Sequence, residues 1–407
     1  MFRPNTLFYT DGYKVGHKKM LAKGTTKLYG SWIPRSLKHG PKGVTKITSF
    51  GQQLAMKWLH DEFTENFFKL PLEEAQEFAK DMSLYLMLEY DGKHFEELHN
   101  LGYLPFKLKA LPEGIETLPN IPHMTFINTV DGFGWLTLYL ETIISSLAWK
   151  PSTSATIARQ YKRNLVEWVT KTDVANLWLV DYMAHDFSAR GLSPWDMLSS
   201  GLGHATSHRG SDSVICIPGA RYFYNEPKNE VIINSVNASE HSVSTTKIFT
   251  VGEKQMIIDW LKEFPIGVLS IVADTFDLWQ LLVQYIADPE VKALILARDG
   301  KLVIRPDSGD PVDIICGTAI TIRDNGKEVS KNEQKGVIQL LWETFGGTIN
   351  AQGYKVLDSH IGAIYGDSIN LDRQIQIYTR LEAKGFASTN IVLGVGSYTY
   401  QMNTRDT

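Results

Sequence analysis

The second half of this 407-residue chain repeats one local pattern, which limits the folds open to it. From about residue 176, short apolar runs are each followed by a polar or glycine-bearing loop and then by an amphipathic helix. The runs that we predict as strands are 176–183, 268–273, 301–305, 362–365 and 391–393. Alternating strands and helices imply a parallel sheet, with the loops after the strands on one edge. We therefore predict an α/β fold, an incomplete or irregular β/α barrel with its chemistry at that edge.

The first part of the chain follows a different pattern, which predicts an N-terminal α+β domain. Helical periodicity extends over 51–59, 72–90, 135–147 and 155–171. Strand-like runs occupy 106–110 and 124–127. We place the α+β domain at residues 1–150 and the barrel-like catalytic domain at residues 151–407.

Composition excludes several classes of protein. A content of 43% hydrophobic and 21% charged residues is typical of a globular chain and argues against disorder. The net charge of −4 gives no reason to expect nucleic acid or an anionic membrane as a partner. Cys216 and Cys316 allow one disulfide at most, and we expect both to be reduced. Because no secretory signal follows Met1, we expect a cytoplasmic protein.

The ends of the predicted strands carry acids, arginines and glycines, the residue types that bind phosphorylated sugars. Glycines let a backbone approach a phosphate, and N–H groups at a following helix start can hold its oxygens. The glycine-bearing candidates are Gly366, Asp367, Gly394, Gly396 and Ser397. A tight turn explains either glycine group alone, so only the presence of both favours phosphate binding.

Two other parts of this edge are each open to two interpretations. Arg305 and Asp307, two residues apart, can face one pocket, where the arginine binds an oxyanion and the aspartate accepts ribose hydroxyls. They can equally form an ion pair that closes a turn. His241 is either a buried histidine oriented by Glu240 or a nucleophile, since a neutral imidazole held by a carboxylate can attack phosphorus.

A series of short motifs, in one order along the chain, resembles the nicotinamide phosphoribosyltransferase family, which is related to the nicotinate phosphoribosyltransferases. The motifs are TDGYKVGH at 10–17, ALPEG at 110–114, HDF at 185–187 with Arg190 and Gly191, GSDS at 210–213, ASEHS at 238–242, IRPDSG at 304–309 and YGD at 365–367. Each motif is short, but together and in register they are specific.

The resemblance implies transfer of 5-phosphoribosyl from phosphoribosyl pyrophosphate to nicotinamide, which yields nicotinamide mononucleotide and pyrophosphate in NAD salvage. It implies that the pyridine ring lies between Phe187 and Tyr13 of the partner subunit, with Asp212 accepting the carboxamide N–H. Two aromatic faces suit a flat heterocycle. It also implies Mg2+ held through phosphates, with no firm protein ligand, and ATP as a co-substrate that phosphorylates His241.

The other candidate residues take their roles from the same resemblance. Arg190, Asp274 and Arg305 are expected to line the base and sugar-phosphate pocket, and Asp307 to hold ribose hydroxyls. The 5′-phosphate is expected to contact Gly366, Asp367, Gly394 and Gly396, and Ser397 can donate a hydrogen bond there. Arg35 and Arg405 are expected to reach the pyrophosphate from the other subunit of a homodimer.

Three alternatives stay open from the sequence. A nicotinate phosphoribosyltransferase shares much of the fold, although Asp212 would repel the carboxylate of nicotinate. The chain ends at Thr407, before a C-terminal segment expected of the family, which suggests a shortened, non-catalytic dimer that only binds pyridine nucleotides. A metal-dependent phosphohydrolase built on His185 and Asp186 is the third, although no further histidines stand at persuasive metal-ligand spacing.

Overall fold

The structure is a computed structural model, and it describes residues 3–401. Within these residues one compact unit comprises the chain up to Thr156 together with Pro218–Lys228, and the other comprises Ile157–Ile217 and the chain from Asn229 onward. The predicted division at residue 150 stays a prediction, and no sequence pattern indicates that Pro218–Lys228 joins the first unit. Every helix between residues 3 and 401 is too short or too polar to traverse a bilayer.

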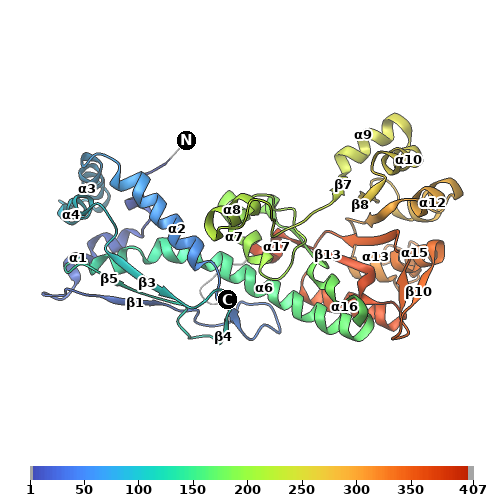
Figure 1. The fold of residues 1–407 in the computed structure, drawn as a ribbon, viewed down its shortest axis with the longest axis horizontal. Coiled ribbons are helices and arrows are strands. Elements are labelled where there is room, and N and C mark those ends of the chain that lie inside the picture. The colour runs from blue at the N-terminus through green and yellow to red at the C-terminus, as the bar shows by residue number, and fades with distance from the viewer. Residues whose placement is uncertain (1–2, 402–407) are drawn as a thin grey trace. The chain divides into compact units, whose positions relative to one another are not determined.

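The second unit is built on a curled parallel sheet of six strands, which confirms the predicted barrel-like α/β architecture (Figure 1). In spatial order the strands are β6 (Ala184–Phe187), β13 (Ile391–Gly396), β12 (Ile361–Tyr365), β9 (Asp299–Arg305), β8 (Ile266–Val272) and β7 (Asn237–Ala238). A separate antiparallel pair is formed by β10 (Gly347–Ile349) and β11 (Lys355–Leu357). The carboxyl ends of the six parallel strands therefore lie along one edge.

Two short stretches of chain, residues 210–211 and 234–238, connect the two sides of this curled sheet. Gly210 forms an isolated parallel bridge with Asn234, and the adjacent Ser211 bridges to Asp186 of β6. Three residues after Asn234, strand β7 begins and pairs with β8 at the opposite side of the sheet. The sheet is thus curled enough for residues 234–238 to link its two sides, which is the irregular barrel expected from the sequence.

Helices follow most of the parallel strands of the second unit. They are α7 (Pro194–Ala205), α9 (His241–Val251), α10 (Glu253–Glu263), α11 (Leu278–Gln280), α12 (Pro289–Leu296), α13 (Pro311–Cys316), α14 (Lys331–Lys335), α15 (Val337–Phe345), α16 (Leu371–Ala383) and α17 (Ser397–Gln401). The start of α7 carries a typical helix-start signal: Ser193 accepts a hydrogen bond from the Asp196 N–H at 3.2 Å, and Pro194 is the first helical residue.

The structure corrects three local predictions. Residues 176–183 are not a strand: most of them form a 3-10 helix, Val174–Asp181, in which only Val180 is buried, and β6 begins at Ala184. Helix α6 (Glu141–Thr172) continues through the gap between the two predicted helices, while residues 135–139 form a separate short helix. Helix α6 contains Pro151, whose ring packs on Gly51, where a side chain would not fit. The glycines of 394–396 lie inside β13 rather than in a loop after it.

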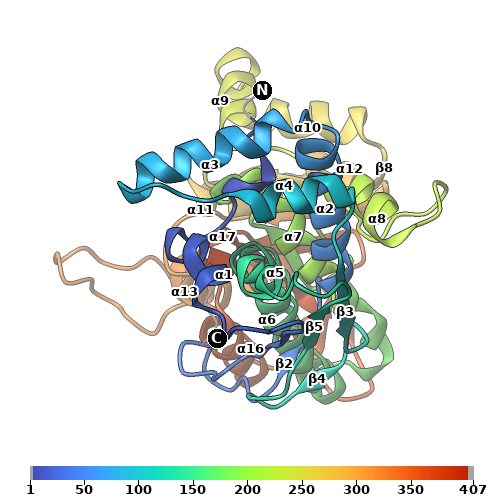
Figure 2. The ribbon, with the colours of Figure 1, turned by 90° about the vertical axis from the view of Figure 1, so that its left-hand side faces the viewer.

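The first unit is the expected α+β domain. Its antiparallel sheet contains, in order, β1 (Tyr29–Trp32), β5 (Met124–Asn128) and β3 (Phe106–Ala110), and a second pair is β2 (Ile47–Thr48) with β4 (Glu116–Thr117). Its helices are α1 (His17–Met20), α2 (Gln52–Phe63), α3 (Glu73–Leu86), α4 (Lys93–Leu101), α5 (Trp135–Tyr139) and most of α8 (Cys216–Tyr224). Figure 2 shows α3 and α4 side by side. An aromatic core, in which Phe95 contacts Phe78 and Trp135, holds these helices together.

Candidate functional site

A cavity of about 1110 Å³ opens at the carboxyl ends of the parallel strands in the second unit. Eleven of the residues singled out from the sequence line it: Phe187, Arg190, Asp212, Glu240, His241, Arg305, Asp307, Gly366, Asp367, Gly396 and Ser397. They come from stretches of chain that are far apart in sequence, as expected for an active site on a β/α barrel. Two groups of these residues, described in turn, differ in how completely their polar atoms are paired.

The ring of Phe187 lies against the backbone of two strand ends. A Cβ atom added to Gly394 would come within 2.5 Å of the Phe187 Cδ2 atom, and one added to Gly366 would come within 3.5 Å of Cε2. Phe187 pairs in register with Gly396. The glycines thus make room for a flat ring on the sheet, a role that the sequence interpretation, which considered only phosphate contacts, did not include.

The carboxylate of Asp212 stands beside this ring in the cavity. Its Oδ1 atom accepts a hydrogen bond from the Nε2 atom of His185 at 3.0 Å and another from the hydroxyl of Ser235. Burial tends to raise the pKa of Asp212, but these hydrogen bonds and the charge of Arg305 lower it below its ordinary value. We call His185, Phe187, Asp212 and Ser235 the aromatic cluster.

The carboxylate of Asp186 is buried directly below the aromatic cluster and is satisfied within the protein. It accepts hydrogen bonds from the Ser188 N–H at 2.9 Å, the Ser211 hydroxyl at 3.1 Å and the Ser213 hydroxyl at 2.6 Å. These contacts fix the loop that carries Asp212. Between residues 3 and 401 no three His, Cys, Asp or Glu side chains are grouped to hold a metal ion.

A second group, which we call the histidine cluster, contains His241, Asp274, Arg305 and Asp307. The Oδ2 atom of Asp274 accepts a hydrogen bond from the Asp307 N–H at 2.9 Å and another from the Ser308 hydroxyl. Arg305 donates to the Ser239 carbonyl at 2.8 Å. Over residues 3–401, no hydrogen bond reaches two further buried atoms of this cluster, Oδ1 of Asp274 and Nε of Arg305.

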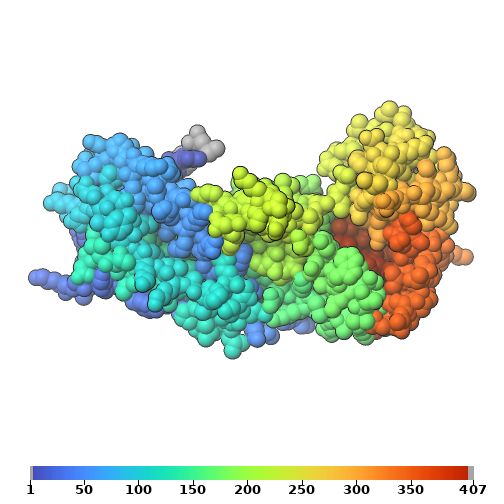
Figure 3. Space-filling model, viewed as in Figure 1, coloured from blue at the N-terminus to red at the C-terminus, as the bar shows by residue number. Residues whose placement is uncertain are grey.

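His241 is the first residue of α9, and its side chain is 47% exposed, so it is not a buried histidine. Its Nε2 atom lies 3.7 Å from the Oδ1 atom of Asp274 and 3.7 Å from the Oδ2 atom of Asp307. Glu240 instead accepts a hydrogen bond from the Ser242 hydroxyl. The carboxylates that face His241 are therefore Asp274 and Asp307. Figure 3 shows α9 and α10, in yellow, at the surface.

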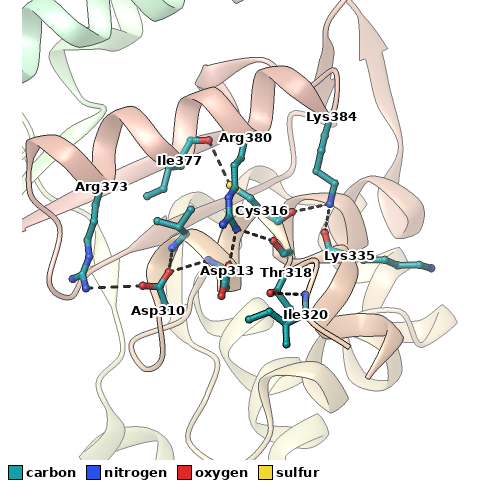
Figure 4. A network of polar contacts seen from close by, with 12 residues as sticks. Asp310, Asp313, Cys316, Thr318, Ile320, Lys335, Arg373, Ile377, Arg380 and Lys384 are labelled. Carbon is teal, nitrogen blue, oxygen red and sulfur yellow. Dashed lines mark hydrogen bonds and ion pairs between the residues drawn. The ribbon is translucent and has the colours of Figure 1, made fainter. Parts of the chain in front are cut away.

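The loop that leads from β12 into α16 also lines the cavity, and α16 itself contributes Arg373, which the sequence interpretation missed. Arg373 donates to the Ser368 carbonyl and lies 4.0 Å from Asp310 at the start of α13. Figure 4 shows this pair as the first of several polar links between α13 and α16. The others join Arg380 to Asp313 at 2.6 Å, and Lys384 to the Cys316 carbonyl at 2.7 Å. These contacts join α13 to α16, the helices that follow β9 and β12, and both of these strands lead into site residues.

The remaining predicted site residues are not on the cavity wall. Asp274 and Gly394 lie behind it, against Asp307 and Phe187 respectively. Tyr13, 66% exposed, and Arg35, also exposed, belong to the first unit, and Arg405 falls outside the described residues. Their roles across a subunit boundary stay predictions. Ser235 and the orienting role of His185 were missed because they depend on contacts between distant segments.

Comparisons with known proteins agree with this geometry. The model of the nicotinate phosphoribosyltransferase (NAPRTase) family matches residues 182–407. The nicotinamide phosphoribosyltransferase of Acinetobacter baylyi is 42% identical over all of this chain and 81% of the relative, and that of Mycoplasma pneumoniae is 30% identical over 98% and 87%. The fold is similar to that of human nicotinic acid phosphoribosyltransferase, with a TM-score of 0.58, 15% identity, and coverage of 95% of this chain and 72% of that one.

Proposed function

We propose that this chain, a phosphoribosyltransferase that belongs to the nicotinate phosphoribosyltransferase family, transfers phosphoribosyl to nicotinamide. In this reaction the ring nitrogen of nicotinamide displaces pyrophosphate from C1 of phosphoribosyl pyrophosphate, which forms nicotinamide mononucleotide for NAD salvage. The observation that carries the choice of base is the ionised Asp212 carboxylate beside the exposed face of Phe187.

The aromatic cluster suits an uncharged pyridine amide. One face of Phe187 lies on the glycine backbone, which leaves the other face for a flat ring. Asp212 can accept a hydrogen bond from a carboxamide N–H, whereas it would repel the carboxylate of nicotinate. The cluster therefore favours nicotinamide over nicotinate, as the names of the curated relatives also do.

The histidine cluster supplies charge for the sugar phosphate. Loss of pyrophosphate leaves a C1 carbon with oxocarbenium character, so catalysis depends on positioning and on fixed charges. Asp307 would accept ribose hydroxyls, and Arg190 and Arg305 would bind phosphate oxygens; all three residues line the cavity. The buried Arg305 Nε atom, which makes no hydrogen bond within residues 3–401, is one donor that a bound ligand would satisfy.

We further propose that Mg2+ and ATP take part. Mg2+ prefers oxygen ligands and usually binds through one or two carboxylates and substrate phosphates. Asp274, whose buried Oδ1 atom has no hydrogen-bond partner within residues 3–401, and Asp307 fit that role. A neutral His241 imidazole would attack the terminal phosphorus of ATP as the bond to ADP breaks, and its Nε2 atom lies 3.7 Å from an oxygen of each of these carboxylates.

The proposed enzyme is a homodimer in which each site is completed by the other copy. Tyr13 of the partner subunit would cover the free face of the ring, and Arg35 of the partner subunit would reach the pyrophosphate. The exposure of both side chains in the first unit supports this proposal.

The direct test is an assay for mononucleotide and pyrophosphate with purified protein and phosphoribosyl pyrophosphate. We expect product from nicotinamide, faster product with ATP present, and little product from nicotinate. An Asp307→Ala variant that keeps its melting temperature should lose the activity. Product from nicotinate alone would instead identify a nicotinate enzyme, and mononucleotide binding with no turnover would identify a non-catalytic binder.

A further inference from the structure

The two oxygens of the Asp212 carboxylate are in different states before any ligand binds. Oδ1 accepts two hydrogen bonds, from the Nε2 atom of His185 at 3.0 Å and from the hydroxyl of Ser235. Across residues 3–401, no hydrogen bond is made to Oδ2. The side chain is 45% exposed and lines the cavity that Phe187 also lines. One oxygen is therefore fixed by the protein, and the other is available to a ligand.

The chemistry of the carboxylate sets the direction of both hydrogen bonds. An ionised carboxylate only accepts, so the Nε2 atom of His185 must carry the proton that it shares with Oδ1. Ser235 must likewise donate its hydroxyl hydrogen. Both donors stabilise the negative charge, so Asp212 remains an acceptor that cannot donate to a carboxylate ligand.

The two donors are themselves firmly placed, and by separate segments of chain. His185 lies in β6 with its ring 4.7 Å from that of Phe187, and a Cβ atom at Gly210 would come within 2.9 Å of its Nδ1 atom. Ser235 follows Asn234, whose carbonyl accepts a hydrogen bond from the Ser211 N–H at 3.0 Å. Turning the carboxylate would break both hydrogen bonds, since neither donor is free to follow it.

We propose that His185 and Ser235 are positioning residues that determine the preference for an uncharged carboxamide over a carboxylate. They hold Asp212 ionised, with Oδ2 directed at the amide N–H of the base. Without them, Asp212 can turn or take up a proton, and a protonated Asp212 can donate to nicotinate. This inference rests on the proposed function, because it takes nicotinamide as the ligand at Asp212.

The test compares kcat/KM and calorimetric affinity for nicotinamide and nicotinate between about pH 4.5 and pH 8. His185→Leu and Ser235→Ala should each lower the nicotinamide-to-nicotinate ratio by about tenfold, mainly through KM and affinity for nicotinamide. His185→Gln, which keeps an N–H near the Nε2 position, should preserve most of the ratio. Val236→Ala, at the exposed residue next to Ser235, should leave it unchanged.

The pH profile separates positioning from a merely structural role. Loss of either donor leaves burial to raise the pKa of Asp212, so nicotinamide affinity should fall at a higher pH in both variants than in the wild type. Weaker binding of both bases with an unchanged ratio and an unmoved profile would overturn the inference. Because Ser235 is exposed, Ser235→Ala gives a result even if His185→Leu does not fold.

Failure of this inference is distinct from failure of the proposed function. If the wild type transfers phosphoribosyl to nicotinamide and the variants keep its preference, only the positioning role is wrong. If the wild type transfers to neither base but binds nicotinamide selectively, and the variants lose that selectivity, only the proposed reaction is wrong. If the wild type binds neither base, both are wrong.

Discussion

The aromatic cluster and the histidine cluster each contribute residues to the wall of one cavity but differ in how completely their polar groups are paired. In the aromatic cluster, Asp212 Oδ1 already accepts two hydrogen bonds, and the Phe187 ring rests on the glycine backbone. In the histidine cluster, Oδ1 of Asp274 is buried without a hydrogen-bond partner among the described residues, and His241 lies 3.7 Å from the nearest carboxylate oxygens.

This difference indicates a division of work. A cluster that is rigid before the ligand arrives can discriminate between closely similar flat rings, because a poor fit leaves buried polar groups unpaired. A cluster with unpaired charges instead relies on its ligands, here phosphates and a cation, to complete it. Variants of the aromatic cluster should therefore change the choice of base, and variants of His241 should change the use of ATP.

The largest expected effect tests the aromatic cluster at Asp212. In Asp212→Asn, the amide offers N–H groups to nicotinate and loses the charge that binds the carboxamide. Hydrogen bonds to charged groups are worth about 1.5–3 kcal/mol, so the nicotinamide-to-nicotinate ratio of kcat/KM should fall by about 100-fold. Steady-state kinetics with both bases measures this ratio. An equal loss for both bases would contradict the role of Asp212.

A smaller effect is expected from the glycine under Phe187. In Gly394→Ala the added carbon would lie 2.5 Å from the Phe187 ring, so the ring must move. Overpacking costs about 1–3 kcal/mol, and we expect KM for nicotinamide to rise by about tenfold. Gly396→Ala is the matched control, because a Cβ atom there would meet nothing within 4 Å; both variants are compared at saturating phosphoribosyl pyrophosphate, since Gly396 is an expected 5′-phosphate contact. Similar KM values for the two variants would show that the ring is not held by Gly394.

Lowering the pH should destabilise the segment that carries the aromatic cluster, with an effect comparable to or smaller than that of Gly394→Ala. Burial lowers the pKa of His204, whose Nε2 atom lies 3.1 Å from the carbonyl oxygen of Gly210, close to Asp212. In the unfolded chain His204 has the ordinary histidine pKa of about 6.5, so below that pH it binds a proton that it does not bind in the native protein. The free energy of unfolding therefore decreases as the pH is lowered. The loss approaches about 1.4 kcal/mol per pH unit.

Urea midpoints at about pH 7.5 and pH 5.5 measure this loss. His204→Gln removes the titrating group, so its midpoint should depend less on pH than that of the wild type. A pH dependence identical in the two proteins would exclude His204 as a source of acid sensitivity.

The sequence was sufficient to predict the barrel and most of the cavity, and the reasons are local. Apolar runs such as that of β9 are followed by charged residues, and parallel strands bring those residues to one edge whatever their separation along the chain. Short motifs therefore located Phe187, Asp212, Arg305 and His241 before any contact between them was known.

What the sequence could not predict depends on contacts between distant segments. Nothing near Ser235 indicates that its hydroxyl bonds to Asp212, 23 residues earlier. Glu240 is adjacent to His241 in sequence, yet the carboxylates facing the imidazole come from Asp274 and Asp307, because the first residue of a helix points away from the residue before it. Arg373 was missed for the same reason, since no pattern links α16 to the cavity.

The smallest effect on transfer itself is expected at His241. His241→Ala should abolish incorporation of labelled phosphate from ATP, while transfer without ATP should change by at most about threefold, since the contacts to the base and the ribose are assigned to Phe187, Asp212 and Asp307 and not to His241. His241 is exposed at the start of α9, so its replacement by alanine should leave the fold intact, and an unchanged melting temperature checks this. Glu240→Gln is the control: its carboxylate bonds to Ser242, so the label should persist.

Label that persists in His241→Ala would remove this residue from the use of ATP. A loss of transfer without ATP as large as that expected in Asp212→Asn would show that the two clusters do not divide the work.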